Sequence, residues 1–200
     1  MKPETKRRIL DVISSHGGYS HTKELLKAGV HPAHIAALVV SGSLVRLKRG
    51  LYALEDGNRR RSELADVQRA VPGSVFCIGT ALSLHGIGTW EPPDVHLAVQ
   101  RDRRIKTPYF PPVHIFFFSG ERFELGREKR STPSGTILVY DREKTICDVL
   151  RFRNVLGLDV AMEALREYLK TRKKDVPKLL DYAKRLRMEG TVRNYMEALL

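Results

Sequence analysis

Hydrophobic positions in the first 55 residues recur at helical spacing in three short segments and then flank a basic turn. The spacing predicts helices over residues 2–16, 21–28 and 31–41. Gly17 and Gly18 end the first helix, and Gly29 supplies the turn between the second and the third. Residues 44–53 have apolar positions on both sides of a turn at Gly50, which predicts two paired strands.

This order of elements predicts a winged helix-turn-helix, in which the third helix enters the major groove of DNA and the hairpin is the wing. In the third helix, Ile35, Leu38 and Val39 form the predicted buried face. His31 and His34 are the first candidates for contacts to base edges, and the alternative is that both are surface histidines without a role. The helix lacks Arg and Asn, which make bidentate base contacts. We therefore expect most of the affinity to come from phosphates and the wing.

The wing carries three cations at its predicted tip, and Thr22 is the expected N-cap of the second helix. The predicted DNA-binding residues are Lys6, Arg7, Thr22, His31, His34, Ala37, Ser41, Arg46, Lys48, Arg49 and Arg60.

The charge distribution agrees with a nucleic-acid partner. The 200-residue chain has a formal net charge of +12. Its first 61 residues contain 12 lysines and arginines against 5 acidic residues, so a net charge of +7 lies in the first third of the chain. Concentrated positive charge is what phosphate binding by counterion release requires. The alternative is a charge that serves only solubility.

The rest of the chain predicts a second, α+β domain over residues 62–200, separated by a linker at 57–61 from a winged-helix domain at 1–56. A helix capped by Ser62 is expected to end at Ala70. A short helix opens at Thr80, and strands are predicted over residues 75–78, 95–99, 113–118 and 136–140. Helices are predicted over residues 141–153, 158–172, 175–188 and 191–200. The fold class is therefore α+β, with a helical C-terminal part.

Some polar residues of this domain are of types found in catalytic sites, namely His85, Asp94, His96 and His114. Each has a simpler structural explanation: His85, for example, precedes Gly86 at a helix end, where a cation and a glycine are both favoured. Phosphate-binding loops, nucleophile elbows and zinc-binding helix motifs are missing from the sequence. We therefore expect no enzyme activity, no cofactor and no metal.

Two acidic residues near 145 have expected structural roles. Asp141 is the predicted N-cap of the helix that follows it. Asp148 lies on the apolar face of that helix, so it needs a cationic partner, and Arg142, Lys144 and Arg151 are within helical reach. We expect a structural ion pair.

The two cysteines, Cys77 and Cys147, each lie in an apolar run and are expected to be buried thiols in a reducing compartment. Without a leader-like N-terminus or a long apolar run, the chain is expected to be cytoplasmic, with no membrane partner. A basic series near the C-terminus is either a solvated surface or a second surface for nucleic acid or an acidic partner. It consists of Lys170, Arg172, Lys173, Lys174, Lys178, Lys184, Arg185 and Arg187.

The segments 17–20, 24–30, 38–39 and 42–52 together resemble the N-terminal domain of AbiEi-type antitoxins. Residues 77–86 and 141–150 are similar to segments of the C-terminal region of the same family. Lys144 stands where that family usually has arginine, which keeps the charge but loses the planar fork of the guanidinium. AbiEi-type antitoxins are transcriptional autoregulators of type IV toxin–antitoxin systems.

The resemblance implies a repressor that binds inverted repeats in its own promoter, with double-stranded DNA as its partner. It also implies a role in countering a nucleotidyltransferase-like toxin encoded alongside. Two alternatives remain open from the residues. One is a general transcriptional regulator whose C-terminal domain senses a ligand or dimerises. The other is a nuclease targeted by the winged helix, with Asp94 or Asp148 in its active site.

Overall fold

The structure is a computed structural model that describes residues 1–55 and 62–199 and divides into two units. The first unit comprises residues 1–72 with the segments 105–111 and 132–135, and the second comprises the rest. Helix α4 (Glu63–Ala70), expected at the start of the second domain, lies in the first unit. The predicted linker at 57–61 lies outside the described residues, and the predicted domain boundary stays a prediction.

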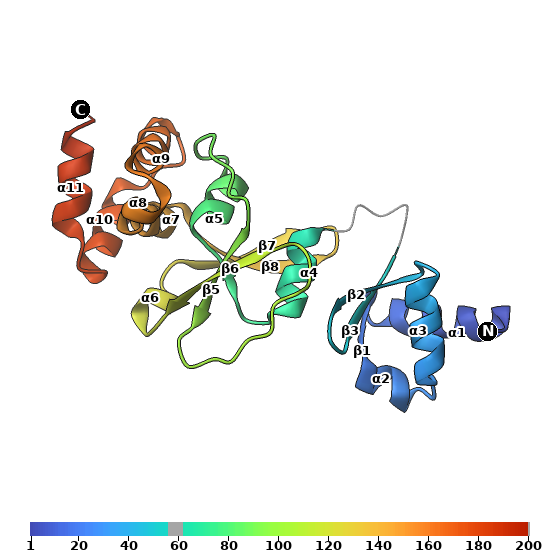
Figure 1. Ribbon diagram of the computed structural model, residues 1–200. Coiled ribbons are helices and arrows are strands. Elements are labelled where there is room, and N and C mark those ends of the chain that lie inside the picture. Colours follow the sequence, from blue (N-terminus) through green and yellow to red (C-terminus); the bar gives the residue numbers. More distant parts are fainter. Residues whose placement is uncertain (56–61, 200) are drawn as a thin grey trace. The chain divides into compact units, whose positions relative to one another are not determined.

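The first unit contains the three predicted helices and the predicted hairpin (Figure 1). Before α4, its elements are α1 (Pro3–Ser15), β1 (Tyr19–His21), α2 (Thr22–Lys27), α3 (Pro32–Val40), β2 (Leu44–Lys48) and β3 (Leu51–Leu54). The strands form an antiparallel sheet in the order β1-β3-β2. This topology confirms the winged helix-turn-helix. Strand β1 was not predicted, because three residues are too few to show an alternating pattern.

A small apolar core holds this unit together. It consists of Ile9, Ile13, Leu25, Val30, Ile35, Leu38 and Leu44. Each fully buried side chain of this size contributes roughly 1.5–3 kcal/mol relative to an exposed one. Val39 packs against the cluster from its edge, so the predicted buried face of α3 is confirmed.

The wing has an irregular register that matters for its packing. The pairing of β2 with β3 shifts between Arg46 and Lys48. Leu44 and Leu47 are therefore both buried, although residues three apart on a regular strand face opposite sides. The turn itself is Arg49-Gly50, where Gly50 has a φ of 81° that favours glycine. Arg46 and Lys48 lie on β2 rather than at the tip.

The second unit contains a five-stranded mixed sheet, and the helices of the C-terminal part of the chain lie together on one side of it (Figure 1). Its strands are β4 (Val75–Phe76), β5 (Val95–Gln100), β6 (Val113–Phe118), β7 (Arg127–Thr132) and β8 (Gly135–Tyr140). Its helices are α5 (Ile78–His85), α6 (Glu121–Glu124), α7 (Arg142–Arg151), α8 (Arg153–Leu156), α9 (Leu158–Lys170), α10 (Val176–Arg185) and α11 (Glu189–Glu197). The α+β class and the helical C-terminal part are confirmed.

The strand order is β6-β5-β4-β8-β7. Strand β4 pairs antiparallel with β5 and parallel with β8, and β5 pairs parallel with β6. The four predicted strands are present, but β7 was missed. Most of its side chains are charged and all but the last are exposed, as suits an edge strand, so it lacks the alternation that predicts a half-buried strand. Among the described residues no helix combines the length and apolar character needed to cross a bilayer.

Helix α7 is buried along most of its length, including its charged residues. Lys144 and Asp148 are both completely buried, and the Nζ of Lys144 donates a hydrogen bond to Oδ2 of Asp148. The ammonium also lies 4.1 Å from the centre of the Tyr140 ring and 4.9 Å from that of Phe118. The expected structural ion pair is therefore present, with Lys144 as the partner of Asp148. Cys77 and Cys147 are buried free thiols, as predicted.

The close approach of α7 to the loop before β7 requires Gly126. A Cβ at this position would lie 2.6 Å from the Cβ of Lys144 and 3.0 Å from Oδ1 of Asp141. The carbonyl of Gly126 accepts a hydrogen bond from the amide of Asp141 at 2.7 Å. A backbone hydrogen bond thus ties the buried start of α7 to the loop before β7.

Replacing Asp148 by alanine is expected to destabilise the second unit by about 3–5 kcal/mol, because it leaves the buried ammonium of Lys144 without its partner. Urea denaturation followed by the fluorescence of Trp90, the single tryptophan, measures this loss. The double variant Lys144→Met/Asp148→Leu should lose less than Asp148→Ala. Glu167→Ala, which breaks an exposed pair with Lys170, is the matched control and should change stability by less than about 0.5 kcal/mol. Equal effects of Asp148→Ala and Glu167→Ala would contradict the assignment.

Candidate nucleic-acid interface

Helix α3 begins with a histidine cap. The Nδ1 atom of His31 accepts a hydrogen bond from the amide of Ala33 at 3.2 Å. Because Nδ1 accepts, the neutral ring carries its proton on Nε2, which remains a donor. The ring of His34 is half-buried, with its centre 6.2 Å from that of His31. The structure therefore brings the two predicted histidines together and gives His31 a structural role at the helix start.

The exposed side of α3 is almost entirely apolar. Ala37 is exposed as predicted, and Ser41 ends the helix with its hydroxyl donating to the carbonyl of Leu38 at 3.2 Å. Ala36 and Val40 are also exposed and were not among the predicted residues. The signal that could have found them is their spacing of three and seven residues from Ala33, which places them on one face.

The turn of the wing lies beside the start of α2. The amide of Thr22 donates to the carbonyl of Gly50 at 3.0 Å, and the same oxygen lies 3.2 Å from Nδ1 of His21. Thr22 was expected to cap α2, but the cap is His21, whose amide donates to Oε2 of Glu24 at 2.6 Å. This bond holds the pKa of Glu24 below its usual value. Arg49 is exposed at the turn.

The other two wing cations make contacts within the first unit. The guanidinium of Arg46 lies 5.9 Å from the centre of the Tyr109 ring, and the amide of Tyr109 donates to the carbonyl of Leu47 at 2.8 Å. Lys48 is half-buried, and its Nζ donates to the carbonyl of Ala70 at the end of α4. A cation is favoured there by the exposed carbonyls of a helix C-terminus. Arg49 is therefore the wing cation with the freest access to a phosphate.

The remaining predicted residues lie on α1 or outside the described residues. Arg7 is exposed on α1. Lys6 lines a cavity of about 380 Å³ together with Asp11, Ser43 and Glu55, so two carboxylates share its surroundings. Arg60 lies outside the described residues. DNA binding by these side chains stays a prediction.

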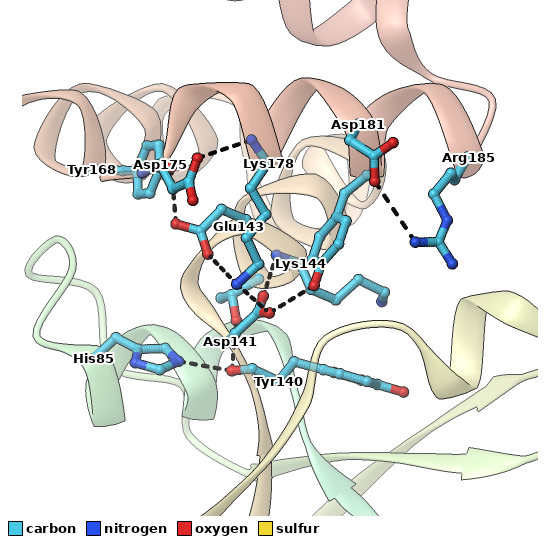
Figure 2. Close-up of polar contacts among 12 residues, drawn as sticks. His85, Tyr140, Asp141, Glu143, Lys144, Tyr168, Asp175, Lys178, Asp181 and Arg185 are labelled. Carbon is cyan, nitrogen blue, oxygen red and sulfur yellow. Dashed lines mark hydrogen bonds and ion pairs between the residues drawn. The ribbon is translucent and has the colours of Figure 1, made fainter. Parts of the chain in front are cut away.

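The second unit has a polar cluster at the start of α7, and Figure 2 shows its side chains directed toward one another. Asp141 caps α7, with Oδ1 accepting from the amide of Lys144 at 2.8 Å, as predicted. Its Oδ2 accepts from the hydroxyl of Tyr182 and from Nζ of Lys178, both at 3.0 Å. These bonds connect α7 to α10. Burial and the Asp141 carboxylate together raise the pKa of Tyr182 to about 12.

Glu143 extends the cluster to α9. Its Oε1 accepts from the hydroxyl of Tyr168 at 3.0 Å, and its Oε2 lies 3.2 Å from Nζ of Lys178. Although burial lowers the pKa of Lys178, its bonds to Asp141 and Glu143 outweigh this effect and raise it. The lysine is thus a fixed cation shared by two carboxylates, and the cluster is a structural junction among three helices.

The histidines of the second unit have structural surroundings. His85 ends α5 beside a left-handed Gly86, and its Nε2 lies 2.7 Å from the carbonyl oxygen of Tyr140 (Figure 2). Nδ1 of His96 accepts from the amide of Gly79 at 3.3 Å. The His96 ring centre is 5.6 Å from that of His114. In the part of the chain that the structure describes, no three His, Cys, Asp or Glu side chains form a group that could hold a metal ion.

Three of the eight residues in the basic series near the C-terminus form ion pairs within the unit. Lys178 bonds Asp141 and Glu143, and Arg185 bonds Glu121 at 2.6 Å. Lys170 lies 3.0 Å from Glu167. These ion pairs reduce the charge that part of this surface presents, and both alternatives for the series stay predictions.

Comparison with known families bears on the first unit. The model of the family described as "Transcriptional regulator, AbiEi antitoxin" matches residues 7–54. This range spans α1 from Arg7 to the end of β3, so the predicted resemblance is confirmed for the winged helix. No curated protein matches the chain. The resemblance of residues 77–86 and 141–150 to the same family stays a prediction.

His96 is expected to make the stability of the second unit depend on pH. Burial and the nearby His114 lower its pKa from 6.5 to about 4, against an opposing effect of Asp94. Between these values the unfolded chain binds a proton that the folded chain does not. The contribution of His96 to the stability of the second unit is therefore complete above pH 6.5. It is lost as the pH falls toward 4, by at most about 3 kcal/mol.

Urea midpoints read from Trp90, whose ring centre is 5.9 Å from that of His96, measure this dependence between pH 4 and 8. His96→Gln should flatten the profile, leaving a smaller slope from His85, whose pKa burial also lowers. His34→Gln in the first unit is the control and should leave the profile unchanged. A wild-type profile that is flat from pH 4 to 6.5 would contradict this prediction.

Proposed function

We propose that this chain is a cytoplasmic DNA-binding autorepressor and the antitoxin of a type IV toxin–antitoxin system. The observation that carries the proposal is the winged-helix unit, with its sheet order β1-β3-β2, matched over residues 7–54 by a family of antitoxin transcriptional regulators. The expected ligand is double-stranded DNA of its own promoter, bound at inverted repeats.

The electrostatics of the first unit support a DNA ligand. Residues 1–55 carry nine lysines and arginines against four acidic residues. A helix that offers few hydrogen-bonding side chains must be held in the groove by phosphate contacts, which position the protein but do not specify sequence. Arg49 at the wing turn is the side chain best placed for such a contact, since Arg46 and Lys48 have partners within the unit.

Neutralising Arg49 is expected to weaken binding to the upstream region of the gene without altering the fold. Arg49→Gln should lower affinity and reduce the slope of log K against log salt concentration by about 1, because one phosphate contact is lost. Mobility shifts over a series of salt concentrations measure both quantities. Arg166→Gln, an exposed arginine of α9, is the matched control and should bind like the wild type. No shift of any upstream fragment at low salt would overturn the proposal.

The antitoxin role is tested separately from repression. We expect the full chain to restore growth when a neighbouring nucleotidyltransferase-like gene is expressed. Arg49→Gln should lose repression of a promoter fusion and keep growth rescue, since the side chain belongs to the DNA-binding unit. Growth assays and reporter activity in the same strains check both outcomes. A wild-type chain that represses its promoter but never rescues growth would leave a general transcriptional regulator as the function.

A further inference from the structure

Helix α3 exposes a continuous apolar stripe. It consists of Ala33, Ala36, Ala37 and Val40, all exposed, with Val40 89% exposed. Their spacing of three, four and seven residues places them on one face of the helix. Ile35 and Leu38 occupy the opposite, buried face. The helix is therefore apolar both where it packs and where it meets solvent.

This pattern departs from that of an ordinary surface helix, whose exposed face is polar. The polar groups at the two ends of the helix make contacts within it: the hydroxyl of Ser41 donates to the carbonyl of Leu38, and Nδ1 of His31 caps the helix, which leaves Nε2 of His31 as a donor at the helix start. A helix that enters the major groove with this face presents methyl groups to the base edges and few hydrogen-bonding groups.

The major groove offers one apolar group of matching chemistry, the 5-methyl group of thymine, which alanine and other apolar side chains contact. Three alanines allow the helix backbone to approach the base edges closely, and the branched side chain of Val40 extends the apolar surface by one further turn. We propose that the stripe on α3 recognises thymine methyl groups, so that methyl contacts specify the operator. This inference rests on the proposed DNA-binding function and names what that site reads.

Charge argues for DNA over a protein as the occupant of the stripe. The guanidinium of Arg8, a residue of α1, lies beside the turn before α3, where its Nη2 would be 3.9 Å from a Cβ placed on Gly29. The surrounding unit has an excess of five positive charges over residues 1–55, which favours a polyanion.

Replacing thymine by uracil tests the inference, because it removes the methyl group and keeps every hydrogen-bonding group of the base. The upstream region of the gene is amplified once with dTTP and once with dUTP, and the full-length protein is titrated against both duplexes. Affinity for the uracil duplex should fall about fourfold for each methyl group in contact, since burying a group of this size contributes about 0.8 kcal/mol. Equal affinity for the two duplexes would overturn the inference and leave the proposed DNA binding intact, whereas binding to neither overturns the proposed function itself.

Variants assign the discrimination to α3. Val40→Ala should weaken binding to the thymine duplex and reduce the ratio of the two affinities, because the valine methyl groups no longer contact the bases. Val155→Ala, an equally simple change at a 73% exposed valine of α8, should leave both affinities unchanged. Arg49→Gln should lower the affinities for both duplexes by the same factor and preserve the ratio of the two affinities. A ratio unaffected by Val40→Ala would show that other residues read the methyl groups and would overturn the assignment to the stripe.

Discussion

The stability of the second unit and the positions of its helices depend on a charged helix in its interior. Helix α7 buries Glu143, Lys144 and Asp148, and each of these charges has an opposite charge within hydrogen-bonding distance. Burying ions costs several kcal/mol apiece, so the arrangement is stable only because the partners are in place. The same requirement fixes the helices around α7: Tyr168 of α9 and Lys178 of α10 must lie where they satisfy the carboxylates at its start.

The first unit is stabilised in a different way, by a small apolar core with few buried charges. Within it, two cations that the sequence assigns to DNA are partly committed to internal contacts, Arg46 to Tyr109 and Lys48 to Ala70. Both partners belong to segments outside the winged helix itself, in the loop 105–111 and at the end of α4. The wing is therefore attached to its surroundings through the side chains expected to meet phosphate, and Arg49 at the turn is the cation left for that task.

Sequence periodicity predicted the longer elements that bury one face and missed the short helices α6 and α8 and two strands. Strand β7 was missed because nearly all its side chains are exposed, and β1 because three residues carry no period. The partner of Asp148 was among three predicted candidates, since helical spacing brings Lys144 within reach. The contacts of Arg46 with Tyr109 and of Lys48 with Ala70 could not be predicted, because these residues are far apart in the sequence and come together only in the folded chain. The exposure of Val40 could have been predicted from its spacing relative to Leu38, because residues two apart on a helix lie on different faces.

In the proposed binding mode, a recognition helix built from alanine and valine means that affinity and specificity come from different contacts. Methyl contacts are individually weak and non-directional, so they discriminate between bases by small factors per position. A protein that reads DNA in this way needs several such contacts in register, which inverted repeats supply when two copies bind together. In the proposed binding mode, the positive charge of the winged helix would provide affinity common to all sequences, and the apolar stripe would provide the difference between them. The low number of polar side chains on α3 is thus compatible with specific binding, provided that the operator is rich in thymine at the positions that α3 contacts.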